Sequence, residues 1–390
     1  MNGFHNPIPS RHFPKDTPPS LSDFKILCSK TTQSKEYPLA SSIQSNIPIY
    51  TLPPFSSLPP SQISALQDEW HQILLSGPGV FVTKATLPKP TITLTNTIYT
   101  SIIASELATA KGDHFSSAGN NSRIWNSFSK HALADPPSFI AYYSSPWLSA
   151  ISSAWLGPAY RITAQVNLVR PGGAAQVGHR DYHLGFQTAE ATAAYPKVTQ
   201  IATQLLTLQG AVAHSDMPLA SGPTRFLPFS QMFEAGYVAY RMPEFQEFFQ
   251  ESFVSVPLEM GDGVWFNPAL FHAAGENTTT DVERCANLLQ VSSAFGRTME
   301  SVDAVPLVEK CWGRLVEMFK EEGWSAEVEA LVRALGDGYS FPTNLDRRPP
   351  QPGGMAPESE QDVLRRGLRD GLDVKGVLRE LETMREESKA

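Results

Sequence analysis

The sequence predicts a mainly β protein with flanking helices, and three observations support this fold class. Short β-rich runs broken by Gly, Pro and Asn fill the stretch from about residue 160 to 296. Apolar residues at helical spacing occur before and after that stretch. No G-x-G-x-x-G or phosphate-binding loop follows a predicted strand, which argues against a nucleotide-binding α/β fold. Many short strands with turn residues between them are typical of a sandwich or barrel.

The first predicted elements lie in the N-terminal third. Residues 1–45 are rich in Pro, Ser and Thr, which predicts a disordered leader. Ser61 is a suitable N-cap for a helix over 61–74, where apolar residues recur at helical spacing up to a stop at Gly77. The run 80–82 then predicts a short strand.

Six further strands and two helices complete the prediction. The strands are expected at 161–168, 204–213, 224–227, 253–257, 263–266 and 287–295. The helices are expected at 306–322 and 325–335, followed by a Pro/Gly break and a charged segment that predicts a solvated helix. The chain is therefore divided into a leader (1–45), a β domain (46–300) and a helical C-terminal extension (301–390).

Composition limits the partners that the protein can have. The chain has 390 residues, of which 41% are hydrophobic, and this is enough for a large core. A net charge of −8 without a basic stripe argues against nucleic acid and anionic membranes as partners. The three cysteines (Cys28, Cys285 and Cys311) are too few and too scattered for a disulfide framework or a thiolate metal site.

The same features predict a cytoplasmic location. The first residues lack the apolar run of a signal peptide, and no apolar stretch approaches the roughly 18–20 residues of a membrane-spanning helix. The chain ends in Ser-Lys-Ala, which is similar to the peroxisomal address Ser-Lys-Leu, so a peroxisomal location is the alternative. The sequence does not indicate an oligomeric state.

His179, Asp181 and His272 form a candidate metal site. Two imidazoles and one carboxylate on one face of a metal leave positions open for a cosubstrate and oxygen. His179 and Asp181 are two residues apart, so on a strand both side chains point the same way. His272 comes from a segment that is distant in the sequence but can fold back beside these two side chains. On its own, however, an H-x-D pair is a common chance match.

The chain also contains a second H-x-D pair, His214 and Asp216. Several strands of roughly 5–6 residues must fit between the paired ligands and the lone histidine of a jelly roll. His179 leaves that room before His272, whereas His214 leaves scarcely enough and precedes the turn-like segment 217–224. We therefore predict that His179 and Asp181 are the ligand pair and that His214 is structural.

Arg284 lies twelve positions after His272, close to the predicted strand 287–295. A planar guanidinium grips a carboxylate with two parallel hydrogen bonds, so Arg284 is a candidate anchor for an acidic cosubstrate. An ordinary surface arginine is the alternative.

Three segments and Arg284 match the motifs of one family in order and spacing: QVGHRDYH, SGPTRFLPFSQ and MGDGVWFNPALFHAAGEN. On these residues the chain resembles the phytanoyl-CoA dioxygenase family of iron(II)/2-oxoglutarate oxygenases over about residues 60–300. The resemblance implies a double-stranded β-helix (jelly-roll, cupin-like) core for the domain 46–300. It implies iron(II) ligation by His179, Asp181 and His272, and 2-oxoglutarate anchoring by Arg284. The implied activity uses O2 to hydroxylate or otherwise oxidise a small organic substrate, with succinate and CO2 as co-products.

The resemblance also implies three further cosubstrate contacts, Gln176, Thr224 and Arg123. Gln176 and Thr224 have the alternative role of satisfying loop and strand backbone. Two positions depart from the family pattern. Gln231 stands where the family has a histidine, and Ala274 replaces a serine that some relatives place near the cosubstrate. Asp181 is retained, which favours hydroxylation or a related oxidation over halogenation.

Aromatic residues near these motifs are candidates for the walls of a pocket: Trp125, Tyr182, Phe186, Trp265 and Phe271. Packing in the core is the alternative for each. His183 is predicted to be a loop residue and not a fourth ligand. The segment 184–196 is longer than a hairpin needs, so we expect it to form a lid.

Two other functions are compatible with the ligand residues. A metal-dependent hydrolase on a cupin-like barrel also needs three protein ligands and an open position. A non-catalytic binding protein that retains the barrel is the second alternative. The sequence does not name the substrate, although the lack of a basic cluster for CoA phosphates disfavours an acyl-CoA.

Overall fold

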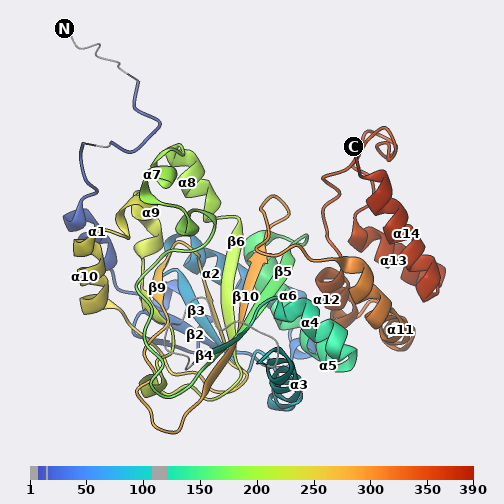
Figure 1. Cartoon of the computed structure of the whole chain (residues 1–390), viewed down its shortest axis with the longest axis horizontal. Helices are drawn as coiled ribbons and strands as arrows, with labels where there is room; N and C mark the ends of the chain where they lie inside the picture. Colours follow the sequence, from blue (N-terminus) through green and yellow to red (C-terminus); the bar gives the residue numbers. More distant parts are fainter. Residues whose placement is uncertain (1–7, 15, 108–120) are drawn as a thin grey trace.

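The computed structural model describes residues 8–14, 16–107 and 121–390, and a large sheet lies at its centre (Figure 1). Within these residues, eight strands form this sheet in the order β1-β2-β3-β8-β6-β10-β5-β4, and β7 and β9 form a second sheet. Neighbouring strands are antiparallel except β2 and β3. The strands are β1 (Ser42–Gln44), β2 (Ile47–Thr51), β3 (Val80–Lys84), β4 (Asn121–Ile124), β5 (Arg161–Val169), β6 (Thr207–Ala213), β7 (Arg225–Leu227), β8 (Gly263–Phe266), β9 (Phe271–Ala273) and β10 (Arg284–Ser292).

Helices flank the large sheet and hold more residues than the strands do within the described ranges. They are α1 (Leu21–Cys28), α2 (Pro60–Ser76), α3 (Lys89–Leu107), α4 (Ser127–Ala134), α5 (Pro136–Tyr143), α6 (Pro146–Leu156), α7 (Ala189–Ala193), α8 (Lys197–Thr203), α9 (Gly236–Ala239), α10 (Pro243–Ser252), α11 (Ala304–Glu322), α12 (Ala326–Leu335), α13 (Glu360–Asp370) and α14 (Val374–Glu387). The fold is therefore mixed, and the prediction of a mainly β chain was wrong in its proportions. The region 89–156 accounts for much of the difference, because α3 to α6 were not predicted.

Along the central strands, side chains point alternately to the two faces of the large sheet. One face packs against helices, and the other faces the smaller sheet. On β6 and β10, Leu208, Val212, Leu289 and Val291 belong to a core shared with the helices. The intervening residues face the other way, because successive side chains of a strand point to opposite faces. Phe226 of β7 lies over that second face, with its ring centroid 5.0 Å from the ring of Phe266. A space enclosed by the two sheets results.

Helix α2 shows how the packed face is built. Its buried residues Leu66, Trp70, Ile73 and Leu74 lie on one side of the helix. The ring of Trp70 stacks on Phe81 of β3 at 5.5 Å and 3°. The helix begins with Pro60 in its first turn, where a missing backbone N–H costs nothing, and ends before Gly77.

The C-terminal helices α11–α14 lie together on one side of the molecule (Figure 1). Helices α11 and α12 were predicted within two residues of their observed bounds. The expectation of a solvated tail was wrong, because Leu364 of α13 and Val377 of α14 are buried in the same core as Trp312 of α11. The apolar residues of α13 form one stripe between charged ones, so high overall charge concealed a packing face.

The predicted leader is also ordered in the part that the structure describes beyond residue 20. Helix α1 buries Phe24, whose ring contacts those of Phe233, Phe245 and Phe271 at 5.0–5.1 Å. Average composition predicted disorder, but Phe24, together with Leu21 and Cys28, packs this short helix into a cluster of buried aromatic residues. Residues 1–7 and 15 of the predicted leader lie outside the described residues.

Several strand predictions coincide with the structure and one does not. The run 263–266 is β8, and 161–168 falls within β5. The run 287–295 is shifted, because β10 begins at Arg284. The run 253–257 is not a strand, and only an isolated bridge joins Val254 to Phe226. Val254 nevertheless packs with the apolar residues of the space between the sheets.

Candidate metal centre and cosubstrate pocket

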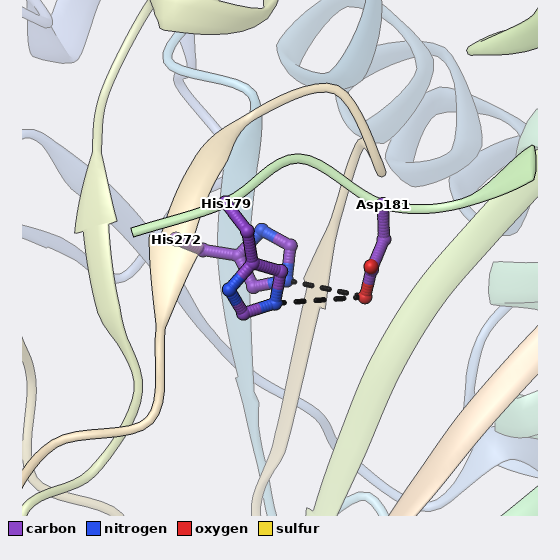
Figure 2. A group of neighbouring side chains, drawn as sticks. All are labelled: His179, Asp181 and His272. Carbon is purple, nitrogen blue, oxygen red and sulfur yellow. Dashed lines mark ion pairs between the residues drawn. The ribbon is translucent and has the colours of Figure 1, made fainter. Parts of the chain in front are cut away.

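The three predicted ligand residues meet at one edge of the space between the sheets (Figure 2). The backbones of His179 and His272 pair as in an antiparallel strand, with N–H to O=C distances of 2.9 and 3.0 Å. The N–H of Asp181 donates to the carbonyl of Pro268 at 2.9 Å. The segment with the H-x-D pair is therefore held beside β9, and the side chains of His179 and Asp181 share one face of it.

The ligand atoms lie close together. The Nε2 atoms of His179 and His272 lie 3.8 and 3.6 Å from Oδ2 of Asp181. The three potential ligand atoms all lie within 4.8 Å of one another. Figure 2 shows both imidazoles turned toward the carboxylate from two separate chain segments. A single cation can therefore contact all three groups.

Backbone contacts fix which nitrogen of each imidazole is available. Nδ1 of His179 lies 2.8 Å from the carbonyl oxygen of Val177, and Nδ1 of His272 lies 2.8 Å from that of Leu270. A carbonyl only accepts hydrogen bonds, so each Nδ1 carries a proton and each neutral ring presents a lone pair at Nε2. Two lone pairs and a carboxylate oxygen then face one another. The two lone pairs and the carboxylate oxygen repel one another unless a cation lies between them. The set of groups fits the two-histidine, one-carboxylate site of iron(II) enzymes.

Burial and neighbouring charges together lower the pKa values of His179 and Asp181, which favours the protonation states that metal binding requires. Burial lowers the pKa of His179, and the nearby His272 acts in the same direction. Burial acts to raise the pKa of Asp181, but the two histidines and a hydrogen bond from Gln209 outweigh it and hold that pKa well below its ordinary value. Gln209 donates from Nε2 to Oδ2 of Asp181 at 2.8 Å. The sequence analysis did not identify this residue.

Arg180, between the two ligands, fixes the ligand segment from behind. Its buried guanidinium donates to the carbonyl oxygens of Ser230 and Phe233. It also lies 5.4 Å from the ring of Tyr237 and 5.0 Å from the ring of Phe271. No signal in the sequence marks this role, because an arginine inside an H-x-D motif reads as a solvent-facing residue.

The ligands open into a cavity of about 790 Å³ between the sheets. Its wall includes all seven residues predicted for the site: His179, Asp181, His272, Arg284, Gln176, Thr224 and Arg123. The volume is in the range of sites that bind small organic molecules.

Arg284 is the buried cation of this cavity. It is the first residue of β10, its exposed fraction is 6%, and burial lowers its pKa to about 10, with a smaller contribution from Arg225. Among the described residues, no carboxylate forms an ion pair with Arg284. A buried charge is costly without a counterion, so this guanidinium provides a site for an acidic group inside the cavity.

The other three predicted contacts line the cavity and also have partners in the protein. Oε1 of Gln176 accepts a hydrogen bond from the backbone N–H of Ala274 at 3.2 Å. The carbonyl of Thr224 accepts one from Ser255 at 3.0 Å. The guanidinium of Arg123 donates to Gln165 at 3.1 Å and lies 4.9 Å from the Trp125 ring. The alternative role in satisfying backbone is thus present for Gln176, whereas the contact at Thr224 is made by its main chain and not by its side chain.

Only part of the predicted aromatic wall faces the cavity. Trp125 and Phe186 line it. Trp265 packs in the helical core and donates from Nε1 to Thr83 at 2.8 Å, and Phe271 packs with Phe24. Tyr182 is buried but is not among the described lining residues. For Trp265 and Phe271 the core alternative is therefore the correct one.

The remaining predictions concern His214, His183 and the segment 184–196. His214 is buried between Asn96 and Tyr142, to which its ring nitrogens hydrogen-bond at 2.6 and 3.0 Å, so it is structural. His183 begins a short 3-10 helix, His183–Phe186, and not a loop, and its Nε2 lies 3.2 Å from the carbonyl oxygen of Arg297. The segment 184–196 contains α7, and its Gly185 carbonyl accepts hydrogen bonds from Tyr240 and Arg241, both at 2.8 Å. Movement of this segment as a lid stays a prediction.

Gln231, which replaces the family histidine, occupies a buried turn. Its Nε2 donates to the carbonyl of Gly77 at 2.8 Å, away from the ligands.

Among the described residues, no helix combines the length and apolar character needed to cross a bilayer.

Comparisons with known proteins place the chain in a family. The family model described as phytanoyl-CoA dioxygenase (PhyH) matches residues 52–286. No curated protein matches the chain at a significant level. Among solved structures, the non-haem α-ketoglutarate-dependent epimerase SnoN from nogalamycin biosynthesis is similar at 16% identity and a TM-score of 0.40, covering 60% of this chain and 84% of that one. The carbocyclase SnoK from the same biosynthesis is similar at 16% identity and a TM-score of 0.43, covering 61% of this chain and 85% of that one. The chain belongs to the phytanoyl-CoA dioxygenase family, as its motifs predicted, and is an enzyme of the iron(II)/2-oxoglutarate dioxygenase type.

Proposed function

We propose that this enzyme hydroxylates, or otherwise oxidises, a small organic substrate in the cavity between its sheets, with succinate and CO2 as co-products. In this proposal His179, Asp181 and His272 hold iron(II), and Arg284 binds the distal carboxylate of 2-oxoglutarate. One observation carries the proposal: three electron-pair donors converge in the same cavity as a buried guanidinium that has no carboxylate partner among the described residues.

Iron(II) and 2-oxoglutarate, when bound, supply the oxidising chemistry with O2, and the protein supplies position and surroundings. The carbonyls of Val177 and Leu270 orient the two imidazoles, and Gln209 fixes the carboxylate of Asp181. Arg284 fixes the far end of the cosubstrate by two parallel hydrogen bonds. Gln176, Thr224 and Arg123 complete the wall around it. Apolar side chains from β6 and β8 restrict water on the other side of the cavity.

We further propose that the two sheets are the halves of a flattened double-stranded β-helix. The backbone pairing of His179 with His272 extends the β7–β9 sheet by one more segment. Packing of Phe226 on Phe266 then closes this smaller sheet over the larger one. Such an arrangement explains how ligand residues that are far apart in the sequence meet in one cavity.

Anaerobic reconstitution with iron(II) and 2-oxoglutarate tests the proposal. We expect the visible metal-to-ligand charge-transfer band of the iron–2-oxoglutarate pair, and succinate formation once O2 is admitted. Asp181→Asn should abolish both signals, because it removes the anionic ligand and keeps the shape. His214→Asn, in the second H-x-D pair, is the matched control and should retain the band. A hydrolase would show neither the band nor succinate, and a binding protein would form no succinate; either result would overturn the proposal.

A further inference from the structure

The cavity wall is divided by polarity across the large sheet. On β6 and β8, the lining residues beyond Gln209 are apolar or lack a side chain: Gly210, Ala211, Ala213, Val264 and Phe266. On β4 and β5, the lining residues are mostly polar: Asn121, Arg123, Gln165, Asn167 and Val169. Strand β10 lies between the two halves, with Arg284 at one end and Gln290 near the other.

Of the two halves, the polar one has the more exposed lining residues. Val264 and Phe266 are buried, whereas Arg123 and Asn167 are partly exposed. The lining residue Trp125, just after β4, is partly exposed as well. Val177 and Phe186, which also line the cavity, are 71% and 54% exposed, so solvent reaches it both along the ligand segment and at the β4–β5 side. The buried Arg284 lies further in, where it serves the cosubstrate.

The connection between β10 and α11 completes the polar half with Met299 and Glu300. Sδ of Met299 accepts a hydrogen bond from Gln165 at 2.7 Å, which attaches this connection to β5. Oε1 of Glu300 accepts from the backbone N–H of Asn126 at 2.7 Å. The other carboxylate oxygen, Oε2, is buried and has no hydrogen-bond partner among the described residues.

Four amide oxygens of lining residues share this condition: Oδ1 of Asn121 and Asn167 and Oε1 of Gln209 and Gln290 are buried without a partner among the described residues. Gln209 already holds Asp181, and Asn121 lies opposite Val169 at the Arg284 end of the sheet, which leaves Asn167, Gln290 and Glu300 for the substrate. Gln290 is only 8% exposed and lies directly opposite Gln209. Buried polar atoms in native proteins are almost always paired, so these unpaired acceptors indicate the groups that a ligand must bring.

We propose that Asn167, Gln290 and Glu300 form a substrate subsite that selects hydrogen-bond donors, so that the substrate is a ring-bearing small molecule with a hydroxyl or amine group. This inference rests on the proposed function, since it assigns the same cavity to the oxidised substrate. An amide can turn over and present its N–H, whereas a carboxylate only accepts, so Glu300 contributes most to the selection and Asn167 and Gln290 add to it. Trp125, Phe186 and Met299 provide the apolar surface for the ring. A long alkyl or acyl chain would leave all three acceptors unpaired.

Binding of matched probes to the metal-free protein tests the subsite without any turnover. The probes are naphthol, its methyl ether methoxynaphthalene, naphthylmethylamine and methyl decanoate, which has no acidic group for Arg284, with dissociation constants measured by ligand-observed NMR. The wild type should bind naphthol about 10-fold more tightly than methoxynaphthalene, as expected for one hydrogen bond to a charged acceptor. Methyl decanoate should bind no better than methoxynaphthalene.

Substitutions test whether Glu300 itself selects the probe or only stabilises the folded protein. Glu300→Leu should reduce the preference for naphthol to within about two-fold, because it removes the acceptor. Glu300→Gln keeps a neutral acceptor and the contact to Asn126, so it should keep part of the preference for naphthol and weaken the binding of the amine more than that of naphthol. Asn167→Leu leaves the Asn126 contact intact and should also reduce the preference, which covers the case that Glu300→Leu does not fold. Glu247→Leu, on an exposed part of α10, is the matched control.

The inference is overturned if methoxynaphthalene or methyl decanoate binds as tightly as naphthol. It is also overturned if the preference survives in every foldable variant of Glu300→Leu and Asn167→Leu. The charge-transfer band is recorded on the same preparations without a probe. A band together with lost selectivity refutes the subsite alone, whereas selectivity without a band refutes the iron assignment alone.

Discussion

Gln209 donates a hydrogen bond of 2.8 Å to the carboxylate of Asp181, and this contact connects the large sheet to the segment that carries the anionic ligand. Gln209 is 3% exposed and lies on β6, whereas Asp181 belongs to the segment beside β9. The contact therefore fixes the carboxylate from the sheet opposite to its own backbone. Groups that orient metal ligands in this way commonly change metal affinity when they are removed.

Gln209→Leu should weaken iron(II) binding by about 10-fold or more, because the Asp181 carboxylate is then free to rotate away from the histidines. Anaerobic titration with iron(II), followed by the charge-transfer band in saturating 2-oxoglutarate, measures the change. Gln290→Leu is the control, since Gln290 lies opposite Gln209 but has no contact with Asp181 among the described residues. Equal iron affinity in wild type and Gln209→Leu would show that the hydrogen bond does not position the ligand.

Arg284→Gln should raise the dissociation constant of 2-oxoglutarate by about 30-fold, which corresponds to the loss of roughly 2 kcal/mol from a charge-assisted contact. Pyruvate lacks the distal carboxylate, so its weaker binding should change by less than about two-fold. Isothermal titration of both acids into the iron(II)-loaded protein under anaerobic conditions gives the two values. Arg225→Gln removes a neighbouring guanidinium that stacks on Phe253, outside the residues that line the cavity. It should leave 2-oxoglutarate binding almost unchanged, and an equal loss in both variants would indicate only a general effect of charge.

The clustering of His179, Asp181 and His272 could be predicted from the sequence because metal ligation restricts the residue types at fixed positions. His179 and Asp181 needed only a strand spacing of two, and the segment around His272 is bounded by Gly and Pro signals. The place of Arg284 in the same cavity could be predicted because a guanidinium suits an acidic cosubstrate, whereas its binding role stays a prediction. The convergence of these residues in one cavity is what their pattern required.

Gln209 and Glu300 could not be predicted, because a glutamine in an apolar strand or a glutamate in a loop carries no local pattern. Only the register of β6 against β10 brings Gln209 opposite Gln290, and register depends on the whole sheet. Helix α3 shows the same limit for the fold. Its Thr- and Ile-rich sequence has the propensity of a strand, but packing of Ile92 and Tyr99 against the rest of the protein selects a helix.

Stability should fall in acid through two buried histidines. Burial lowers the pKa of His214 to about 3 and that of His131 to about 4, although Asp135 opposes the shift at His131. Both folded values lie below the ordinary histidine pKa of about 6.5, so between those values the unfolded chain binds protons that the folded chain does not. The contribution is therefore complete above about pH 6.5 and decreases as pH falls, by about 2 kcal/mol for each histidine at pH 5.

Urea unfolding at pH 7 and pH 5 measures this loss. His214→Gln should be less stable than the wild type at pH 7, because it disturbs the contacts to Asn96 and Tyr142. It should lose about 2 kcal/mol less than the wild type between the two pH values. His71→Gln, at an exposed position of α2, should keep the full dependence on pH. The same acid loss in His214→Gln and wild type would exclude this histidine as a cause.

A chain that ends at Asp303 should not fold, even though residues 301–390 were predicted as a separate extension and the family match ends at residue 286. Truncation there removes α11–α14, and Leu307, Trp312 and Leu331 of these helices are buried in the core that also contains Trp70 and Phe81. Each large apolar side chain contributes about 1.5–3 kcal/mol on burial, so the loss of several exceeds the 5–15 kcal/mol by which domains are stable. A chain that ends at Leu372 removes only α14 and should fold with reduced stability, because α14 buries only Val377 and Leu381. Circular dichroism and size-exclusion chromatography report the outcome, and a folded, iron-binding chain 1–303 would show that the extension is an independent unit.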